Sequence, residues 1–188
     1  RHLGLGEGRA ALDLASGTGV ISHLMDDLGY GVTGIDWSEA MLERARAKAA
    51  SRGRAIRFHL GDAENTFEPD DSYDVVVTRH LVWTLVDPAA CFHEWLRVLK
   101  PGGRLLIVDG DFVNTSRAER LLKRLAAVLE RAGVIKAQTP HAPAAMADTH
   151  ASILSRVHFS GGARVDAVSR LLKEAGFSPV TADTDLRQ

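Results

Sequence analysis

The sequence has little cysteine, no long apolar run and almost no net charge. Its single cysteine, Cys91, cannot form an internal disulfide and provides no pair for a zinc site, so we expect a cytoplasmic protein. No apolar run approaches the roughly 18 residues that a membrane span needs, so we expect no membrane partner. The formal net charge of -1 lacks the basic excess typical of nucleic-acid-binding proteins, and we expect no nucleic-acid partner.

The amino terminus lacks both an initiator methionine and the apolar core of a signal peptide. We therefore expect the sequence to begin inside a longer chain. The 188 residues, 45% apolar and 25% charged, are ordinary for one soluble domain with a substantial core. Residues 1–188 are thus interpreted as a single domain.

Short apolar segments alternate with segments of helical periodicity. We expect strands at residues 9–15, 31–36, 55–61, 73–80, 104–110 and 177–184, and helices beginning near Val20, Ser38, Pro88 and Val165. In the first helix the apolar side chains fall on one face: Val20, Ile21, Leu24, Met25 and Leu28. The alternation predicts an α/β fold with a doubly wound, mostly parallel sheet covered by helices on both faces.

The segment 134–163 interrupts this alternation. It contains Pro140, Pro143 and a Gly161-Gly162 pair, which is typical of an insertion, and we interpret it as a substrate lid. Three histidines also lie in it, at positions 141, 150 and 158. None has the spacing of a helical metal-binding pair, so we expect no metal site.

The stretch "ALDLASGTG" (residues 11–19) indicates a ligand site at the end of the first strand. Gly17 and Gly19 expose backbone amides at a helix N-terminus, beyond the carboxyl end of a parallel strand. Asp36 ends the second strand, where its carboxylate would accept hydrogen bonds from ribose hydroxyls. This pattern favours a nucleoside but leaves NAD, FAD and S-adenosylmethionine (SAM) open. Ser22, where a dinucleotide fingerprint has glycine or alanine, disfavours a pyrophosphate.

Four stretches, in order, resemble the conserved blocks of the class I SAM-dependent methyltransferases, in particular the group that methylates small molecules. "ALDLASGTG" resembles motif I, and it is followed by "VTGIDWSEAMLERAR", "GDAENTFEPDDSYDVVVTRH" and "VLKPGGRLLIVD". Ala15 stands where the family commonly has glycine. The family sheet is Rossmann-like with seven strands, so the six expected here would leave the seventh outside this sequence.

The resemblance implies that SAM is the cofactor and that its methyl group passes to a small-molecule acceptor by in-line displacement. Asp36 would bind the ribose, Asp62 the adenine amino group, and Trp37 would lie against the adenine face. The implied cofactor-binding residues are Asp13, Ala15, Ser16, Gly17, Gly19, Asp36, Trp37, Met41, Asp62, Ala63 and Arg79.

In this family the residues after the fourth strand face the methyl group. His80 is the candidate base, because imidazole titrates near neutral pH, with a structural hydrogen bond to a loop as the alternative. Arg79 would hold the SAM carboxylate or an acidic substrate, or else form a surface ion pair. An NAD-type oxidoreductase and a non-catalytic SAM-binding protein stay open as alternative functions, as do the acceptor atom and the oligomeric state.

Overall fold

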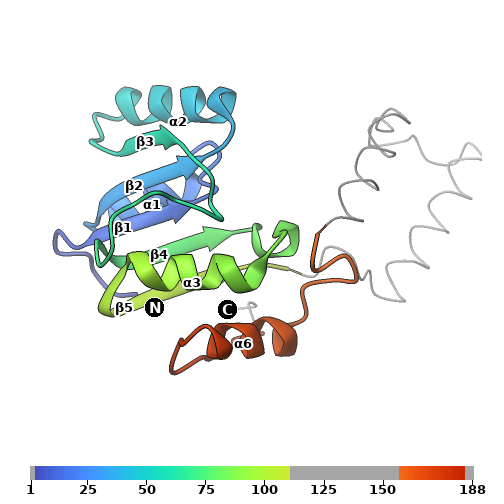
Figure 1. The fold of residues 1–188 in the computed structure, drawn as a ribbon. Coiled ribbons are helices and arrows are strands. Elements are labelled where there is room, and N and C mark those ends of the chain that lie inside the picture. The colour runs from blue at the N-terminus through green and yellow to red at the C-terminus, as the bar shows by residue number, and fades with distance from the viewer. Residues whose placement is uncertain (1–2, 111–156, 185–188) are drawn as a thin grey trace, which may run out of the picture.

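The computed structural model describes residues 3–110 and 157–184, and five strands of this part form one parallel sheet. The strands are β1 (Ala10–Leu14), β2 (Gly31–Asp36), β3 (Arg57–Leu60), β4 (Tyr73–Arg79) and β5 (Leu99–Val108). Their order is β3-β2-β1-β4-β5, so the direction of winding reverses between β1 and β4 (Figure 1). The predicted doubly wound parallel sheet is confirmed.

Helices cover both faces of this sheet (Figure 1). They are α1 (Val20–Asp27), α2 (Glu39–Ser51), the short 3-10 helix η1 (Val82–Thr84), α3 (Pro88–Val98) and α6 (Val165–Glu174). Alternate side chains of the strands serve the two faces. Leu12 and Val76 pack in the cluster with α3 and α6, whereas Ala11 and Val75 pack with Met25 of α1.

The start of α3 follows its sequence signal. The Asp87 carboxylate accepts a hydrogen bond from the Ala90 amide (3.0 Å), and Pro88 occupies the first turn, where no amide hydrogen is needed. The fully buried Phe92 and Trp95 then anchor the helix in the larger core cluster. The expected helix N-terminus at this position is confirmed.

The expected apolar face of α1 is wrong in part. Val20, Leu24 and Leu28 are exposed among the described residues, whereas the polar Ser22 and His23 are buried together with Met25. Ser22 turns inward because its hydroxyl donates a hydrogen bond to the buried Asp13 carboxylate.

Residues 177–184 do not form the expected sixth strand. Phe177 and Val180 pack on the core as irregular chain, and Pro179 between them has no amide hydrogen to donate to a strand ladder. The stretch Lys100–Gly103 forms an irregularity within β5. Tyr73 pairs with Leu99 and Val75 pairs with Arg104, so residues 100–103 bulge out of the ladder.

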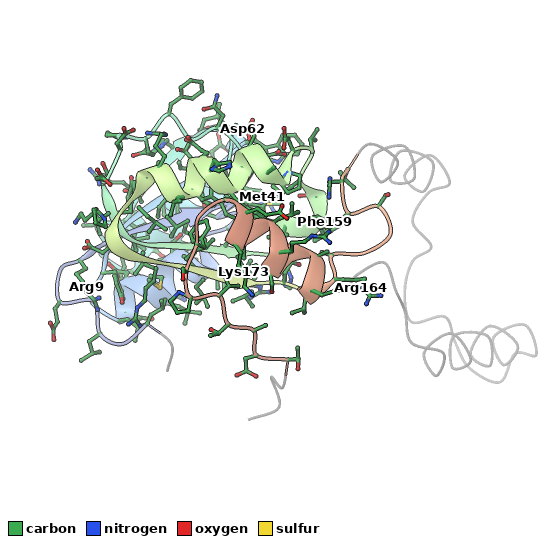
Figure 2. The ribbon with its side chains drawn as sticks, turned by 60° about the horizontal axis from the view of Figure 1, so that its bottom comes forward. Arg9, Met41, Asp62, Phe159, Arg164 and Lys173 are labelled. Atoms are coloured by element: carbon green, nitrogen blue, oxygen red, sulfur yellow. The ribbon has the colours of Figure 1, made fainter. Side chains whose placement is uncertain are left out.

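Most of the expected lid, residues 134–163, lies outside the described residues, as do its histidines at 141 and 150. The described end of this segment is anchored: Val157 and Phe159 are buried, and the His158 amide donates a hydrogen bond to the Leu85 carbonyl (3.0 Å). Figure 2 shows Phe159 on the segment that leads into α6. No helix in the described part has the length and apolar character to cross a membrane.

Candidate functional site

The turn after β1, residues 15–19, forms a glycine corner that lies across the end of β2. Three of its residues have left-handed backbone: Ala15 (φ 54°), Gly17 (φ 55°) and Gly19 (φ 74°). The Ser16 amide donates to the Ile35 carbonyl (2.9 Å), which ties the corner to β2. The left-handed φ at position 15 favours glycine over the alanine present, since a Cβ is strained in this conformation.

The two glycines of the corner have different roles. A Cβ on Gly19 would lie 2.9 Å from Cζ of Phe58 and 3.3 Å from Cβ of Ala45, so Gly19 is needed for packing. A Cβ on Gly17 would meet nothing within 4 Å. The Cα side of Gly17 therefore faces open space, which leaves room for a ligand. The expected exposed amides are wrong, because the Gly17 amide donates to Asp36 Oδ2 (2.8 Å) and the Gly19 amide to the Ser16 carbonyl (2.8 Å).

Asp36, at the end of β2, is bound from two sides. Its Oδ2 accepts a hydrogen bond from the Gly17 amide (2.8 Å) and its Oδ1 accepts one from the Ser38 amide (2.8 Å). Its side chain is 7% exposed. These contacts fix the carboxylate beside the glycine corner and leave further lone pairs for hydroxyl donors, as the ribose assignment requires.

Asp13 is the second carboxylate of the corner and is 1% exposed. The Ser22 hydroxyl donates a hydrogen bond to its Oδ2 (2.5 Å). Burial raises the pKa of Asp13 to about 7; the hydrogen bonds from the Ser22 side chain and backbone oppose this rise, and the charge of Asp36 adds to it. Asp13 thus sits at the protonation boundary near neutral pH.

Ser16 carries a buried polar atom without a partner. Its Oγ has no hydrogen bond within the described structure, and a Cβ on Gly34 would lie 3.0 Å from it. Buried hydroxyls normally have a partner, so an orphaned one points to a ligand group that supplies it. The glycine corner therefore fits a polar cofactor on two counts, the orphaned Ser16 Oγ and the open space over Gly17.

An apolar surface flanks the ends of β2 and β3. Trp37 is 87% exposed, and Met41 and Leu60 are also exposed. Leu60 pairs with Asp36 in the ladder, and the Gly61 amide donates to the Asp36 carbonyl (3.0 Å), so this surface adjoins the buried carboxylate. Exposed aromatic and aliphatic side chains beside polar groups are typical of a site that binds a flat heterocycle.

Asp62 and Ala63 follow β3 at the same edge of the sheet (Asp62 is labelled in Figure 2). Asp62 is exposed, and its Oδ1 accepts a hydrogen bond from the Glu64 amide (2.9 Å). The Ala63 carbonyl accepts one from the buried Trp95 Nε1 (2.8 Å), which directs this carbonyl into the protein. Asp62 is thus placed at the edge, whereas the Ala63 carbonyl is used internally.

The end of β4 brings Arg79 and His80 to this edge. Both are exposed, and His80 has a left-handed backbone (φ 60°). Its amide donates to the Val108 carbonyl (3.0 Å), and its carbonyl accepts from Trp83 Nε1 (3.1 Å). Because β4 lies next to β1, this backbone bend borders the glycine corner at the reversal in strand order, the usual ligand position in such sheets.

Sequence reasoning missed the roles of Ser22 and Glu64, and Asp109 also shapes the site. Ser22 holds Asp13, while the Asp109 carboxylate accepts from the Val82 amide (2.8 Å) and so fixes η1 after β4. Glu64 accepts from the Val86 and Asp87 amides (both 3.1 Å). The signal for Ser22 in the sequence was a polar residue within the largely apolar segment 20–25. No group of three metal-ligating side chains occurs in residues 3–110 and 157–184.

Known proteins match the part of this chain that contains the glycine corner and the ends of β2, β3 and β4. A family model described as a methyltransferase domain matches residues 12–107. A demethylmenaquinone methyltransferase of Clavibacter sepedonicus is 40% identical over 54% of this chain and 41% of its own length. A ubiquinone biosynthesis O-methyltransferase of Caulobacter vibrioides is 34% identical over 54% of this chain and 40% of its own.

A solved structure, the PH0226 protein of Pyrococcus horikoshii, is 33% identical with a TM-score of 0.54, covering 66% of this chain and 53% of its own. The chain thus spans about two fifths of the length of these two curated relatives and about half of this structure.

Proposed function

The chain belongs to the class I SAM-dependent methyltransferases, and from this we propose that it transfers the methyl group of SAM to a small-molecule acceptor. The observation that carries the proposal is the Asp36 carboxylate, which is fixed by the Gly17 and Ser38 amides beside the open backbone of Gly17. The named relatives are a demethylmenaquinone methyltransferase and a ubiquinone biosynthesis O-methyltransferase, which supports a small-molecule acceptor. The family match also speaks against the NAD-type oxidoreductase alternative.

In this proposal the cofactor lies along the ends of β1, β2 and β3. Asp36 binds the ribose hydroxyls and Asp62 the adenine amino group, with Trp37 and Met41 against the adenine. The methionine part of the cofactor lies along the glycine corner. The residues proposed for that part are Asp13, Ala15, Ser16, Gly17 and Gly19. The Ala63 backbone borders the adenine.

When bound, SAM supplies a methyl group already activated by its sulfonium. The protein's contribution is then mainly to hold the acceptor in line with that methyl group. Arg79 and His80 lie at the edge where an acceptor would enter, next to the glycine corner. We propose that His80 takes the acceptor's proton where the acceptor must lose one, and that Arg79 binds a carboxylate.

The wider organisation follows the same proposal. Residues 1–188 form one methyltransferase domain in which the segment 134–163 covers the acceptor. The anchoring of its described end on Leu85 supports this, because η1 follows directly from the β4 end. We propose a cytoplasmic location, since the single cysteine, Cys91, is buried and cannot form an internal disulfide.

Isothermal titration of the full chain with SAM and with S-adenosylhomocysteine tests the cofactor proposal. Saturable binding of both is expected. The variant Glu43→Gln, which changes an exposed residue of α2, is a control and should bind SAM as tightly as the wild type. Absence of binding by a chain that circular dichroism shows to be folded would overturn the proposal.

A second assay separates an enzyme from a non-catalytic SAM-binding protein. Radiolabelled SAM is incubated with a panel of quinols, phenols, amines and thiols, and label transfer is measured. Transfer to at least one class is expected. Binding without transfer to any of them would favour the non-catalytic alternative.

A further inference from the structure

Two buried carboxylates lie at the ends of neighbouring strands, and they are supported unequally. Asp36 receives amide hydrogens from two separate residues, Gly17 and Ser38, whereas among the described residues Asp13 is bonded by Ser22 alone, through its hydroxyl and its backbone. Within the described residues neither carboxylate has a salt-bridge partner. Asp13 is also the more deeply buried of the two, 1% exposed against 7% for Asp36, so a negative charge on Asp13 is the more costly one.

The elements packed against Asp13 contribute no positive charge. In the ladder Asp13 pairs with Gly34 of β2 and Val77 of β4, and α1 contributes the neutral Ser22. Among the described residues, the charged group that acts on Asp13 is Asp36, which repels a second negative charge. Ionised Asp13 is thus costly until a cation arrives next to it.

A cation is what the proposed cofactor brings. Both SAM and S-adenosylhomocysteine carry an ammonium group in their methionine part, and SAM has a sulfonium as well. The glycine corner, where we place that part, begins two residues after Asp13. A positive charge there favours the ionised form of Asp13 over the protonated one.

Resting on the proposed function, we propose that Ser22 is a positioning residue for Asp13, and that cofactor binding is coupled to the release of a proton from this carboxyl group. On binding, the Asp13 O–H bond breaks, the electron pair stays on the carboxylate, and the proton passes to the solvent. The Ser22 hydroxyl keeps donating to Oδ2 and stabilises the ionised form that the ligand needs.

Proton release is measured on the wild-type chain by titrating SAM at pH 7 in two buffers that differ in ionisation enthalpy. Because the pKa of Asp13 is about 7, we expect release of about half a proton per bound SAM. SAM affinity should also rise on the order of tenfold from pH 5.5 to 7.5. Binding without proton release and with no dependence on pH would overturn this inference and leave the proposed function intact. Absence of binding at every pH would instead remove the proposed function.

Two variants assign the effect to particular residues. Asp13→Asn cannot ionise, so it should show no proton release beyond that of the ligand's own amine, and serves as the baseline. In Ser22→Ala the ionised Asp13 carboxylate loses a hydrogen bond, which raises the pKa of Asp13 further. Relative to the Asp13→Asn baseline, the rise in SAM affinity should therefore occur at higher pH than in the wild type. At pH 8.5 its affinity should approach that of the wild type.

A uniform loss of affinity in Ser22→Ala at all pH values would show a merely structural role and overturn the positioning assignment. Ser22→Thr, which keeps the hydroxyl, should restore the wild-type pH profile. Thermal melts establish that each variant is folded. If a variant does not fold, the two-buffer measurement on the wild type still decides the proton coupling. Glu43→Gln again serves as the matched control, with an unchanged profile.

Discussion

The ends of β1, β2 and β4 lie at one edge of the sheet. They differ in which groups are held in place, the side chains or the backbone. At β1 and β2 the functional side chains, Asp13 and Asp36, are buried and held by hydrogen bonds from Ser22 and from backbone amides. At β4 it is the backbone of His80 that is held, while the side chains of Arg79 and His80 are exposed.

Under the proposed function, the difference suits two kinds of ligand that bind at one edge of the sheet. A fixed cofactor is bound well by groups that are already oriented, because little conformational entropy is lost on binding. An acceptor that differs from one family member to the next is served by exposed side chains on a rigid backbone bend. The variants below change one end at a time, so each tests whether the two ends are independent.

The largest effect is expected for Asp36→Ala. Its removal leaves the Gly17 and Ser38 amides without their acceptor and deletes the proposed ribose contact. SAM affinity should fall on the order of 100-fold, about 3 kcal/mol, while the fold survives. Calorimetry gives the affinity and circular dichroism the fold; an unchanged affinity would show that the ribose assignment is wrong.

Asp13→Asn should raise stability while it alters SAM binding. Burial raises the pKa of Asp13 in the folded chain to about 7, above the ordinary value of 3.8, so its favourable contribution to stability is complete at low pH and is lost as the pH rises towards 7. The variant should therefore match the wild type near pH 3.5 and exceed it at pH 8 by on the order of 2 kcal/mol. Urea unfolding of the ligand-free chains at both pH values measures this. Equal free energies of unfolding of the variant and the wild type at pH 8 would show that burial does not raise the pKa of Asp13.

The two glycines of the corner should respond differently to alanine. Gly19→Ala places a methyl group against Phe58 in a left-handed backbone and should cost about 2 to 3 kcal/mol of stability. Gly17→Ala has room and should cost only about 1 kcal/mol, for its backbone conformation. SAM affinity should nevertheless fall in Gly17→Ala, because the new methyl group occupies the proposed ligand side. Equal urea unfolding midpoints for Gly17→Ala and Gly19→Ala would show that the two glycines do not differ in their role in packing.

Ala15→Gly should stabilise the chain slightly. Glycine relieves the left-handed strain at φ 54° but adds freedom to the unfolded state, which leaves a net gain of roughly 0.5 kcal/mol. The thermal midpoint at fixed pH should therefore rise by a few degrees at most. A clear loss of stability would indicate that the Ala15 methyl group makes contacts that outweigh its strain.

The smallest change in cofactor affinity is expected for His80→Gln, at the β4 end. SAM affinity should stay within about twofold of the wild type, because the two ends act on different ligands. Calorimetry under the conditions used for Asp36→Ala allows the SAM affinities of the two variants to be compared. A tenfold loss would show that the β4 end also holds the cofactor and would abolish the contrast.

The strand ends and their residue types could be predicted from the sequence. Asp36 and the Asp87-Pro88 helix start depend on local signals, and the structure places both as expected. Side-chain burial on α1 could not be predicted in the same way, because an apolar pattern does not say which face meets the sheet. Ser22 faces inward because its hydroxyl donates a hydrogen bond to Asp13, which lies nine residues earlier in the chain. Likewise the segment 177–184 contains the apolar Phe177 and Val180, but Pro179 between them has no amide hydrogen for a strand ladder, and the segment is irregular.

The positions of the tryptophans have an optical consequence. Trp95 is fully buried and bonded to the Ala63 carbonyl, whereas the indole of Trp37 is 87% exposed beside the proposed adenine position. A water-borne quencher such as acrylamide would therefore reach Trp37 freely and Trp95 scarcely at all. A purine stacked on Trp37 would shield it, so in a chain whose third tryptophan, Trp83, is replaced by phenylalanine, Trp37 reports occupancy of the site and Trp95 is an internal reference that needs no label.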